Sequence, residues 1–550
     1  MLRGAIRVFR GMFAVLVLVV AVLGLGLPAL GLSLALRPPP AWSTTLPARA
    51  TVSGGRLTLG PCFRENIGGL IHVHLAGSPG DMGWAQGVLA GDLIAILQGE
   101  LMERFVAAAP TVVARHLILG FVGWNGRNLE TQLHPEEIAE IAGITAGHAA
   151  CNDPYTAVLP PYATGLQCHA LHDVSQYLID NPLVQPPVVG CTAVAVWGKH
   201  SRNGHLCVGR IFDFEGGRCF DRDKVVYTIA PAPDQGHHFV AVAWGGMAGA
   251  VTGCNDAGLW VSLNAAASDD VRLNGRPMIM VVRDILQHCA NISQAVAVVK
   301  NAEVFVTDSL LIASVADDRA VAVEKGPGGM AVREGVDDCL VVTNHFLAPE
   351  WSGDHANQRR IADSTTATRY ARVQELLAQT PVQDPETLLA LLRDRRGLGG
   401  ADVGFGNRGA INAWIAAHLV VADVTARTLW VCAAPHGLGA ATAFGIDGPV
   451  AVAGFPADPE SALACAEGER LDALAEDTRH CLRAGEVADA QVYSRQLLML
   501  NPRNFLANLL AGLAASDQAE RRRLITRAGN LAPPYAEDRR EIAAALAACR

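Results

Sequence analysis

Charged residues are scarce in this chain, and no long basic run is present. Only 18% of the 550 residues are charged, and the formal net charge is −9 at pH 7. Proteins that bind nucleic acid concentrate Lys and Arg on one face or segment, so no nucleic acid partner is expected. Half of the residues are hydrophobic, which is enough for a large core and excludes a mainly disordered chain.

The chain also lacks closely spaced cysteine pairs. It has no glycine-rich phosphate-binding loop in the required place between a strand and a helix. Its 13 cysteines include no Cys-x-x-Cys pair, so neither a zinc ribbon nor a thioredoxin-type site is expected. His169, His172 and Asp173 come closest to a metal set, but they fall in an irregular segment. We therefore predict no metal and no cofactor. An odd cysteine count leaves at least one free thiol in an oxidising compartment, and Cys191 is the candidate.

One long hydrophobic run is present, at the N-terminus. Residues 12–36 carry no charge, and the run is long enough to cross a hydrocarbon layer of about 30 Å. Arg3, Arg7 and Arg10 precede it, which favours a cytoplasmic N-terminus and a catalytic part on the periplasmic or extracellular side. We expect residues 1–40 to be a membrane anchor. The alternative is a signal segment cut near Ala50, which gives a secreted protein.

The rest of the chain changes texture at Cys191. Residues 41–190 are predicted to be a mostly helical pro-segment, in which the helix at 80–108 follows short strands. Residues 191–455 contain short β-branched and aromatic runs separated by turns, with helices such as 365–379 between them. This alternation is typical of sheets covered by helices on their outer faces.

A helical tail follows at residues 456–550. The spacing around Asn501-Pro502, where one helix ends and Asn504 begins the next, resembles a tetratricopeptide unit. Arrays of such units need about three repeats, so a single unit is weak support. The tail is predicted either to bind a protein partner or to pack on the main domain.

The junction Gly190-Cys191 lies between a loop and the first strand of the β-rich part. A chain can be cut there without breaking a sheet, and Gly190 has no side chain to obstruct a thiol. On its own, a Gly-Cys pair before a strand usually marks a buried small residue. Polar residues at ordered positions downstream make the junction a candidate site.

Arg210 and Asp213 stand on the next predicted strand. An Arg near a thiol favours the thiolate, and an Asp can hold a newly formed α-ammonium group. On a regular strand, residues three positions apart face opposite sides. We therefore expect a bend or strand end that brings both side chains to one site, and the alternative is a surface ion pair.

Three further polar positions follow. Asn264 ends a predicted strand, where its amide N–H can face an oxyanion, although it can equally be a turn cap. Asn344 lies in the strand-end cluster Thr343-Asn344-His345-Phe346, and Arg369 follows Ser364 at the start of the 365–379 helix. A Cys191–His345 dyad is a weaker alternative.

The order of these residues resembles the N-terminal-nucleophile hydrolases, and most closely the isopenicillin-N acyltransferase family of self-processing cysteine peptidases. Relatives of that family include penicillin V acylase, conjugated bile acid hydrolase and acid ceramidase. The resemblance covers about residues 70–440 and implies an α+β fold, a four-layer αββα sandwich. It implies a cut between Gly190 and Cys191, and it assigns site roles to Cys191, Arg210, Asp213, Asn264, Asn344 and Arg369.

In that assignment Cys191 is the nucleophile and its freed α-amino group is the base. Arg210 and Asp213 position them, and Asn264 serves the oxyanion hole. Asn344 holds the α-amino group or substrate, and Arg369 completes the network. The α-amino group can serve as the base because the ordinary pKa of a cysteine thiol, about 8.5, is close to that of an α-amino group, about 7.7–8.0.

We therefore expect a self-processing amidohydrolase or acyltransferase. Its partner is a small-molecule amide or acyl donor, which it attacks to form an acyl-cysteine at Cys191. Two alternatives stay open: a lipid-amide hydrolase at the membrane, and a catalytically idle scaffold whose helical tail binds a partner.

Overall fold

The computed structural model describes residues 39–108, 111, 115, 126–151, 161–170, 173, 189–270, 272 and 274–549. The predicted membrane segment at 12–36 lies outside these residues, as do His172 and most of the loop before Gly190. The anchor and the side of the membrane therefore stay predictions. Within the described ranges, no helix is both long enough and apolar enough to cross a membrane.

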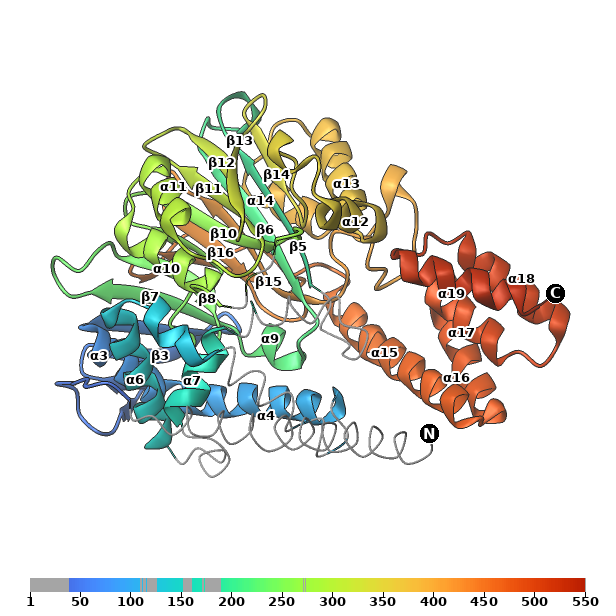
Figure 1. Ribbon diagram of the computed structural model, residues 1–550, viewed down its shortest axis with the longest axis horizontal. Coiled ribbons are helices and arrows are strands. Elements are labelled where there is room, and N and C mark those ends of the chain that lie inside the picture. Colours follow the sequence, from blue (N-terminus) through green and yellow to red (C-terminus); the bar gives the residue numbers. More distant parts are fainter. Residues whose placement is uncertain are drawn as a thin grey trace, which may run out of the picture.

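Two β-sheets form the centre of the described part of the chain (Figure 1). The larger has eleven strands and the smaller has seven. In spatial order the larger sheet contains β1 (Thr51–Ser53), β2 (Arg56–Leu59), β3 (Cys62–Ile67), β4 (Leu70–Gly77), β7 (Val225–Pro231), β8 (Phe239–Ala243), β9 (Thr252–Asn255), β10 (Leu259–Ala265), β11 (Asp308–Ser314), β12 (Arg319–Gly326) and β13 (Gly329–Glu334).

The smaller sheet carries the predicted nucleophile. Its strands, in spatial order, are β14 (Cys339–Val342), β5 (Val189–Val196), β6 (Cys207–Phe214), β15 (Ala416–Asp423), β16 (Thr428–Cys432), β17 (Ala441–Gly445) and β18 (Gly448–Pro449). β5, with Cys191, pairs antiparallel with both β6 and β14. β6, which contains Asp213, and β14, which ends just before Thr343, are therefore direct neighbours of the strand that holds the thiol.

Helices cover the outer face of each sheet. On the larger sheet lie α3 (Pro79–Leu89), α10 (Met278–His288) and α11 (Ile292–Asn301), with α6 (Pro135–Ala149) against α3. On the smaller sheet lie α13 (Thr366–Gln379) and α14 (Pro385–Leu392). The remaining helices of this part are α4 (Gly91–Ala108), α7 (Pro161–His169), α9 (Arg218–Arg222) and α12 (His355–Asp363).

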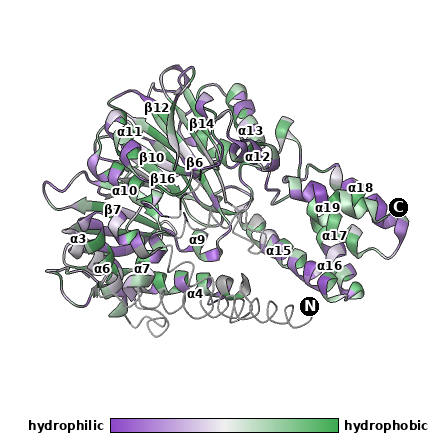
Figure 2. Cartoon of the chain, in the orientation of Figure 1, coloured by the Kyte–Doolittle hydropathy of each residue, from purple (hydrophilic) through white to green (hydrophobic). Residues whose placement is uncertain are grey.

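Separate hydrophobic clusters fill the spaces between these layers. The cluster between the two sheets contains Val208 and Val420 from the smaller sheet and Val240, Trp260 and Leu311 from the larger. Hydrophobic residues concentrate on the central strands (Figure 2), as expected for strands buried on both faces. The layer order is helix, sheet, sheet, helix, which is the order that the resemblance implies.

The N-terminal part contributes strands as well as helices. Its strands β1–β4 extend the larger sheet, and β4 pairs in parallel with β7, so residue 190 is not a boundary in space. The helix expected at 80–108 is two helices that part at Ala90. Gly83 of α3 lies against α6, where an added methyl would be 2.0 Å from the Glu140 carbonyl oxygen. Only glycine permits that approach.

The tail forms α15 (Ser461–Ala484), α16 (Val487–Leu500), α17 (Phe505–Ala514), α18 (Gln518–Gly529) and α19 (Ala536–Ala547). Each helix packs on the next, and α15 runs from the sandwich to the others (Figure 1). As the sequence predicts, α16 ends just before Asn501-Pro502, and the Asn504 side chain caps α17.

Candidate active site

Strands β5 and β6 form a ribbon with two chemically different faces. Cys191 is paired with Phe212, and Gly190 with Asp213. Because side chains alternate along a strand, Cys191, Arg210, Phe212 and Phe214 face the larger sheet, and we name this side the thiol face. Thr192 and Asp213 face α13, and this is the amide face.

The expected bend between Arg210 and Asp213 is absent. β6 is regular over Cys207–Phe214, so the two side chains lie on opposite faces, as their spacing dictates. Both still reach the Gly190-Cys191 segment because its backbone runs between the faces. The expectation that the two groups must share one side was wrong.

On the thiol face, Arg210 lies beside the buried Cys191 thiol. Its Nη2 is 3.8 Å from Sγ, and the guanidinium also donates to the Leu263 carbonyl oxygen and to Thr252 Oγ1. Burial raises the pKa of the Cys191 thiol, and the Arg210 charge opposes that rise. The geometry therefore keeps a cation where it favours the thiolate.

His418 of β15 belongs to this cluster, although the sequence did not single it out. Its Nε2 lies 2.9 Å from both Arg210 Nη1 and Thr252 Oγ1. A guanidinium can only donate, so Nε2 accepts, and burial holds the pKa of this imidazole well below its usual range. The available signal was a lone His inside the hydrophobic strand run 416–423.

On the amide face, two side chains bracket the Cys191 peptide groups. The Cys191 N–H donates to Asn344 Oδ1 at 2.7 Å, and Arg369 Nη1 donates to the Cys191 carbonyl oxygen at 2.5 Å. Arg369 Nη2 also donates to Asn344 Oδ1 at 2.6 Å, while the Asn344 N–H is held by Thr366 Oγ1 at 2.7 Å. The two predicted residues thus hold consecutive peptide groups, Asn344 at the Gly190–Cys191 bond and Arg369 at the Cys191–Thr192 bond.

Asp213 is buried next to Gly190. A methyl group added to Gly190 would lie 3.2 Å from Asp213 Oδ2 and 3.6 Å from Arg369 Nη2. Burial raises the pKa of Asp213 to about 7, against the opposing charges of Arg369, Arg408 and Arg210. Within the described residues, its buried Oδ1 has no hydrogen-bond partner. A free carboxyl oxygen therefore stands beside the predicted cut.

Asn264 holds a strand end. Its Nδ2 donates to the carbonyl oxygens of Val342 and Thr343, at 3.1 and 3.2 Å, so both amide hydrogens are used in this uncut chain. The predicted oxyanion role stays a prediction. His345 has its Nδ1 within 3.0 Å of the hydroxyls of Thr343 and Thr366, and the Cys191–His345 dyad stays an alternative.

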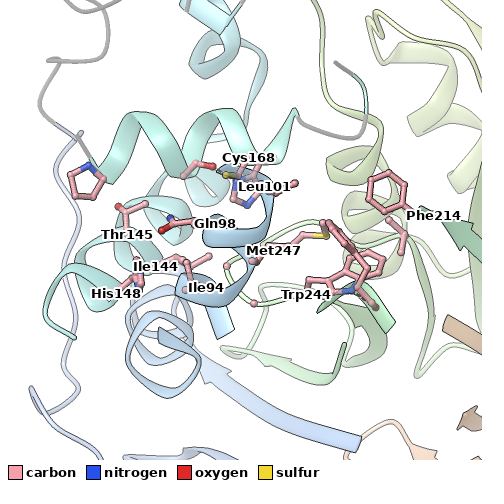
Figure 3. Close-up of a pocket in the computed structure, with 18 of the residues that line it drawn as sticks. Ile94, Gln98, Leu101, Ile144, Thr145, His148, Cys168, Phe214, Trp244 and Met247 are labelled. Atoms are coloured by element: carbon pink, nitrogen blue, oxygen red, sulfur yellow. Dashed lines mark hydrogen bonds between the residues drawn. The ribbon is translucent and has the colours of Figure 1, made fainter. Parts of the chain in front are cut away.

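A hydrophobic pocket extends from the thiol face into the N-terminal part of the chain (Figure 3). Its cavity volume is about 80 Å³. Aromatic rings line one end, and residues of α4, α6 and α7 line the other; the lining includes Phe212, Phe214, Phe220, Trp244, Met247, Leu97, Leu101 and Ile144. Phe212 is paired with the buried Cys191 across the ribbon, so the pocket lies next to the strand pair that carries the thiol.

The comparison with protein families matches one family over the catalytic part. The family described as AAT: Acyl-coenzyme A:6-aminopenicillanic acid acyl-transferase matches residues 205–400. The part of the chain at residues 205–400 is therefore related to this acyl-transferase family. The matched range includes Arg210, Asp213, Asn264, Asn344 and Arg369, whereas Cys191 lies just before it and the helical tail lies beyond it.

Among curated proteins, this acyl-transferase relative is 24% identical over 309 residues to an uncharacterized protein of Archaeoglobus fulgidus, a match that covers 50% of each chain. The chain thus spans about half the length of the curated relative that it matches.

Solved structures with partial likeness include three enzymes. The Caenorhabditis elegans ortholog of N-acylethanolamine-hydrolyzing acid amidase is 16% identical, with a TM-score of 0.32, and covers 42% of this chain and 93% of its own. The R18L variant of conjugated bile acid hydrolase from Clostridium perfringens is 11% identical, with a TM-score of 0.32, over 47% and 95%. Penicillin V acylase from Agrobacterium tumefaciens is 17% identical, with a TM-score of 0.31, over 46% and 85%. Because these scores are low, neither the fold nor the chemistry of this chain is inferred from them.

Proposed function

We propose that the protein is a self-processing amidohydrolase or acyltransferase that uses the Cys191 thiol. The proposal is carried by the clamp on Cys191, whose N–H donates to Asn344 Oδ1 at 2.7 Å and whose carbonyl oxygen accepts from Arg369 at 2.5 Å. A residue held through the amides on both of its sides, at the start of a buried strand and with its thiol beside a cation, is well placed for cleavage of the bond that precedes it. The family match of residues 205–400 supports the same chemistry.

The first step is an attack of Cys191 Sγ on the Gly190 carbonyl carbon. The C–S bond forms, the Gly190–Cys191 C–N bond breaks, and the nitrogen leaves as the α-amino group of Cys191. Water then hydrolyses the thioester. Asn344 Oδ1, which accepts from this nitrogen before the cut, can accept from the amino group afterwards, and the free Oδ1 of Asp213 offers a second acceptor nearby.

The cut chain then acts on other amides. The α-amino group takes the thiol proton, since the two groups titrate close together, and the thiolate attacks the substrate carbonyl to give an acyl-cysteine. Water as acceptor completes a hydrolysis, and an amine acceptor completes an acyl transfer.

The pocket favours substrates with an apolar acyl group. Sites that bind small molecules are mostly apolar with few polar groups, and this lining is mostly apolar and includes Phe212, the neighbour of Cys191 across the ribbon. A lipid amide is therefore the second candidate substrate, and the predicted anchor at residues 12–36 would bring the enzyme to such a substrate at a membrane.

Replacing the nucleophile tests the proposal. The wild-type chain should give two fragments on a denaturing gel, one of which begins at Cys191 by N-terminal sequencing. Cys191→Ala should stay a single chain of 58 kDa, and Cys191→Ser should be cut slowly and lose most of its turnover. If Cys191→Ala still yields fragments that meet at residue 190, self-processing is refuted. A wild-type chain that stays intact favours the idle scaffold.

A further inference from the structure

The helical tail holds one loop of the catalytic part, residues 402–414, which connects to β15. The Asn501 side chain exchanges two hydrogen bonds with the Phe405 backbone, at 2.9 and 3.1 Å. Asn504 Nδ2 donates to the same carbonyl oxygen at 2.9 Å, and Arg503 forms an ion pair with Asp402. The turn between α16 and α17 is therefore fastened to this loop by side chains.

Hydrophobic packing also holds the 402–414 loop against the tail. The Phe405 side chain packs among the tail leucines and lies 4.9 Å from the Trp414 ring, centroid to centroid. Gly404 lies so close to the Asn504 backbone that an added methyl would be 2.5 Å from its nitrogen. The loop and the tail therefore form one packed unit, and this contact lies beyond the residues that match the acyl-transferase family.

The same loop presents Arg408 to the amide face. Arg408 Nη2 donates to Glu215 Oε1 at 2.6 Å, and its Nη1 donates to the Ala413 carbonyl oxygen at 2.6 Å. Glu215 stands two residues after Asp213 in the chain. Arg408 thus brings a fixed positive charge to the buried Asp213 carboxyl, whose pKa it lowers.

Tyr535, just before α19, belongs to a tail segment that packs on the same loop. Asn407 Nδ2 donates to the Ala532 carbonyl oxygen at 3.4 Å, and a methyl on Gly409 would lie 3.9 Å from Pro534, so the 532–535 segment lies on this loop. The half-buried Tyr535 phenol interacts electrostatically with Arg408, Arg369, Glu215 and Asp213.

We propose that the C-terminal tail is a working part of the active site, in which Arg408 and Tyr535, both placed where the tail packs on the 402–414 loop, are positioning residues for the end of β6 that carries Asp213 and leads to Glu215. This inference rests on the proposed function, because it gives the tail a role at the same cut. The tail then acts inside the chain, through the 402–414 loop.

The charged groups around Asp213 make the effect directional. Arg369 faces it from α13, Arg210 from β6, and Arg408 and Glu215 from the loop side, while Cys191 lies across the ribbon. Removing the Arg408 charge favours the protonated carboxyl. Removing the Tyr535 ring admits water, which favours the charged carboxyl. The two changes should therefore move the pH dependence of the cut in opposite directions.

The test compares Arg408→Gln and Tyr535→Ala in the full chain. The extent of self-cutting is measured on gels between pH 5 and 9. The acidic limb of this pH profile should move to higher pH by up to about one unit in Arg408→Gln and to lower pH in Tyr535→Ala. Arg408→Lys, which keeps the charge, should restore most of the wild-type profile. Met499→Gln, at an 81% exposed position on α16, is the matched control and should not move it.

A second measurement does not depend on cutting. In a thermal double-mutant cycle, Arg408→Gln and Asp213→Asn should be non-additive at pH 8, where Asp213 is charged, and close to additive at pH 5. The inference would be overturned if the effects are additive at both pH values, or if the acidic limbs of Arg408→Gln and Tyr535→Ala move in the same direction. A wild-type chain that is never cut would refute the proposed function, while this cycle would still decide whether the tail controls Asp213.

Discussion

On the thiol face of the β5–β6 ribbon, Cys191 lies beside Arg210, and its neighbour Phe212 lines an apolar pocket, whereas the amide face gathers Asn344, Arg369 and Asp213 around the peptide backbone. Each face is fixed by the alternation of two paired strands. In the proposed function, the amide face positions the bond that would be cut and the amino group that would result. The thiol face would provide the nucleophile and the space for an acyl group.

Substitutions on the two faces should therefore affect different steps of the proposed reaction. A change on the amide face should impair the cut itself, and every later turnover with it. A change in the pocket should leave the cut intact and alter only which acyl groups are accepted. The substitutions below are ordered by the size of the effect expected from this difference.

Arg369→Lys should have the largest effect. A lysine keeps the charge but cannot reach Cys191 O, Thr192 Oγ1 and Asn344 Oδ1 together, which the Arg369 fork does. We expect the cut to slow by about 10²–10³-fold, the cost of losing a preorganised donor. The measurement is the time course of fragment formation on a denaturing gel.

Arg372→Lys is the matched control on the same helix. Arg372 pairs with Asp394 and Glu375, away from Cys191, so its replacement should leave the time course close to wild type. If Arg369→Lys is cut at the wild-type rate, the Arg369 contacts with Cys191 are not needed for cleavage, and the proposed role of the amide face is wrong.

Asp213→Asn should change how stability depends on pH. The pKa of Asp213 is raised from its ordinary 3.8 to about 7 in the folded chain, so between about pH 4 and 7 the folded chain binds more protons than the unfolded chain. The free energy of unfolding therefore falls as pH rises through this window, by an amount on the order of a few kcal/mol. Asparagine removes that loss.

The measurement is thermal unfolding of uncut chains in a Cys191→Ala background at pH 5 and pH 8. Relative to its parent, Asp213→Asn should gain melting temperature between pH 5 and 8. Asp234→Asn, at an exposed position, should show no such gain. An equal difference between variant and parent at both pH values would mean that Asp213 is already charged at pH 5.

The layers and most elements could be predicted from the sequence, since short β-branched runs and amphipathic helices have distinct periods. The helices expected at 365–379 and from Pro385 appear as α13 and α14. Residues 54–78 also gave strands, but local pattern could not show that β4 joins β7, because the pairing of strands about 150 residues apart is decided by packing and not by period.

The candidate site shows the same limit. The three-residue spacing predicts that Arg210 and Asp213 face opposite sides of a regular strand, and the structure has them there. The expectation of a bend that brings both side chains to one side was wrong. His418 had only the signal of a lone His in a hydrophobic run, and Arg408 and Tyr535 had none, because each reaches the site through tertiary contacts from β15, the 402–414 loop or the tail. Sequence order locates residues that follow one another along the sheet, and misses those brought in from elsewhere.

Phe214→Leu tests the pocket on the thiol face. The smaller side chain widens the end beside Phe220 and Trp244, so preference should move toward bulkier acyl groups by about tenfold, within the range for a changed apolar pocket. A series of N-acyl amides of increasing size, assayed for kcat/KM, measures the change. Phe239→Leu, an equally buried ring outside the pocket lining, is the control, and self-cutting should be unaffected in both.

Thr145→Val should have the smallest effect. Thr145 lines the far end of the pocket, but its hydroxyl already donates to the Ala142 carbonyl oxygen at 3.0 Å. The ring nitrogens of His169, also in the lining, are engaged by the Gly165 carbonyl oxygen and the Ala248 N–H. These groups are satisfied by the protein, so an apolar acyl chain gains nothing from them, and kcat/KM should change by less than about threefold across the series. A larger loss confined to polar acyl groups would mean that this end of the pocket reads a polar substituent, and the proposed preference for apolar acyl groups would then be wrong.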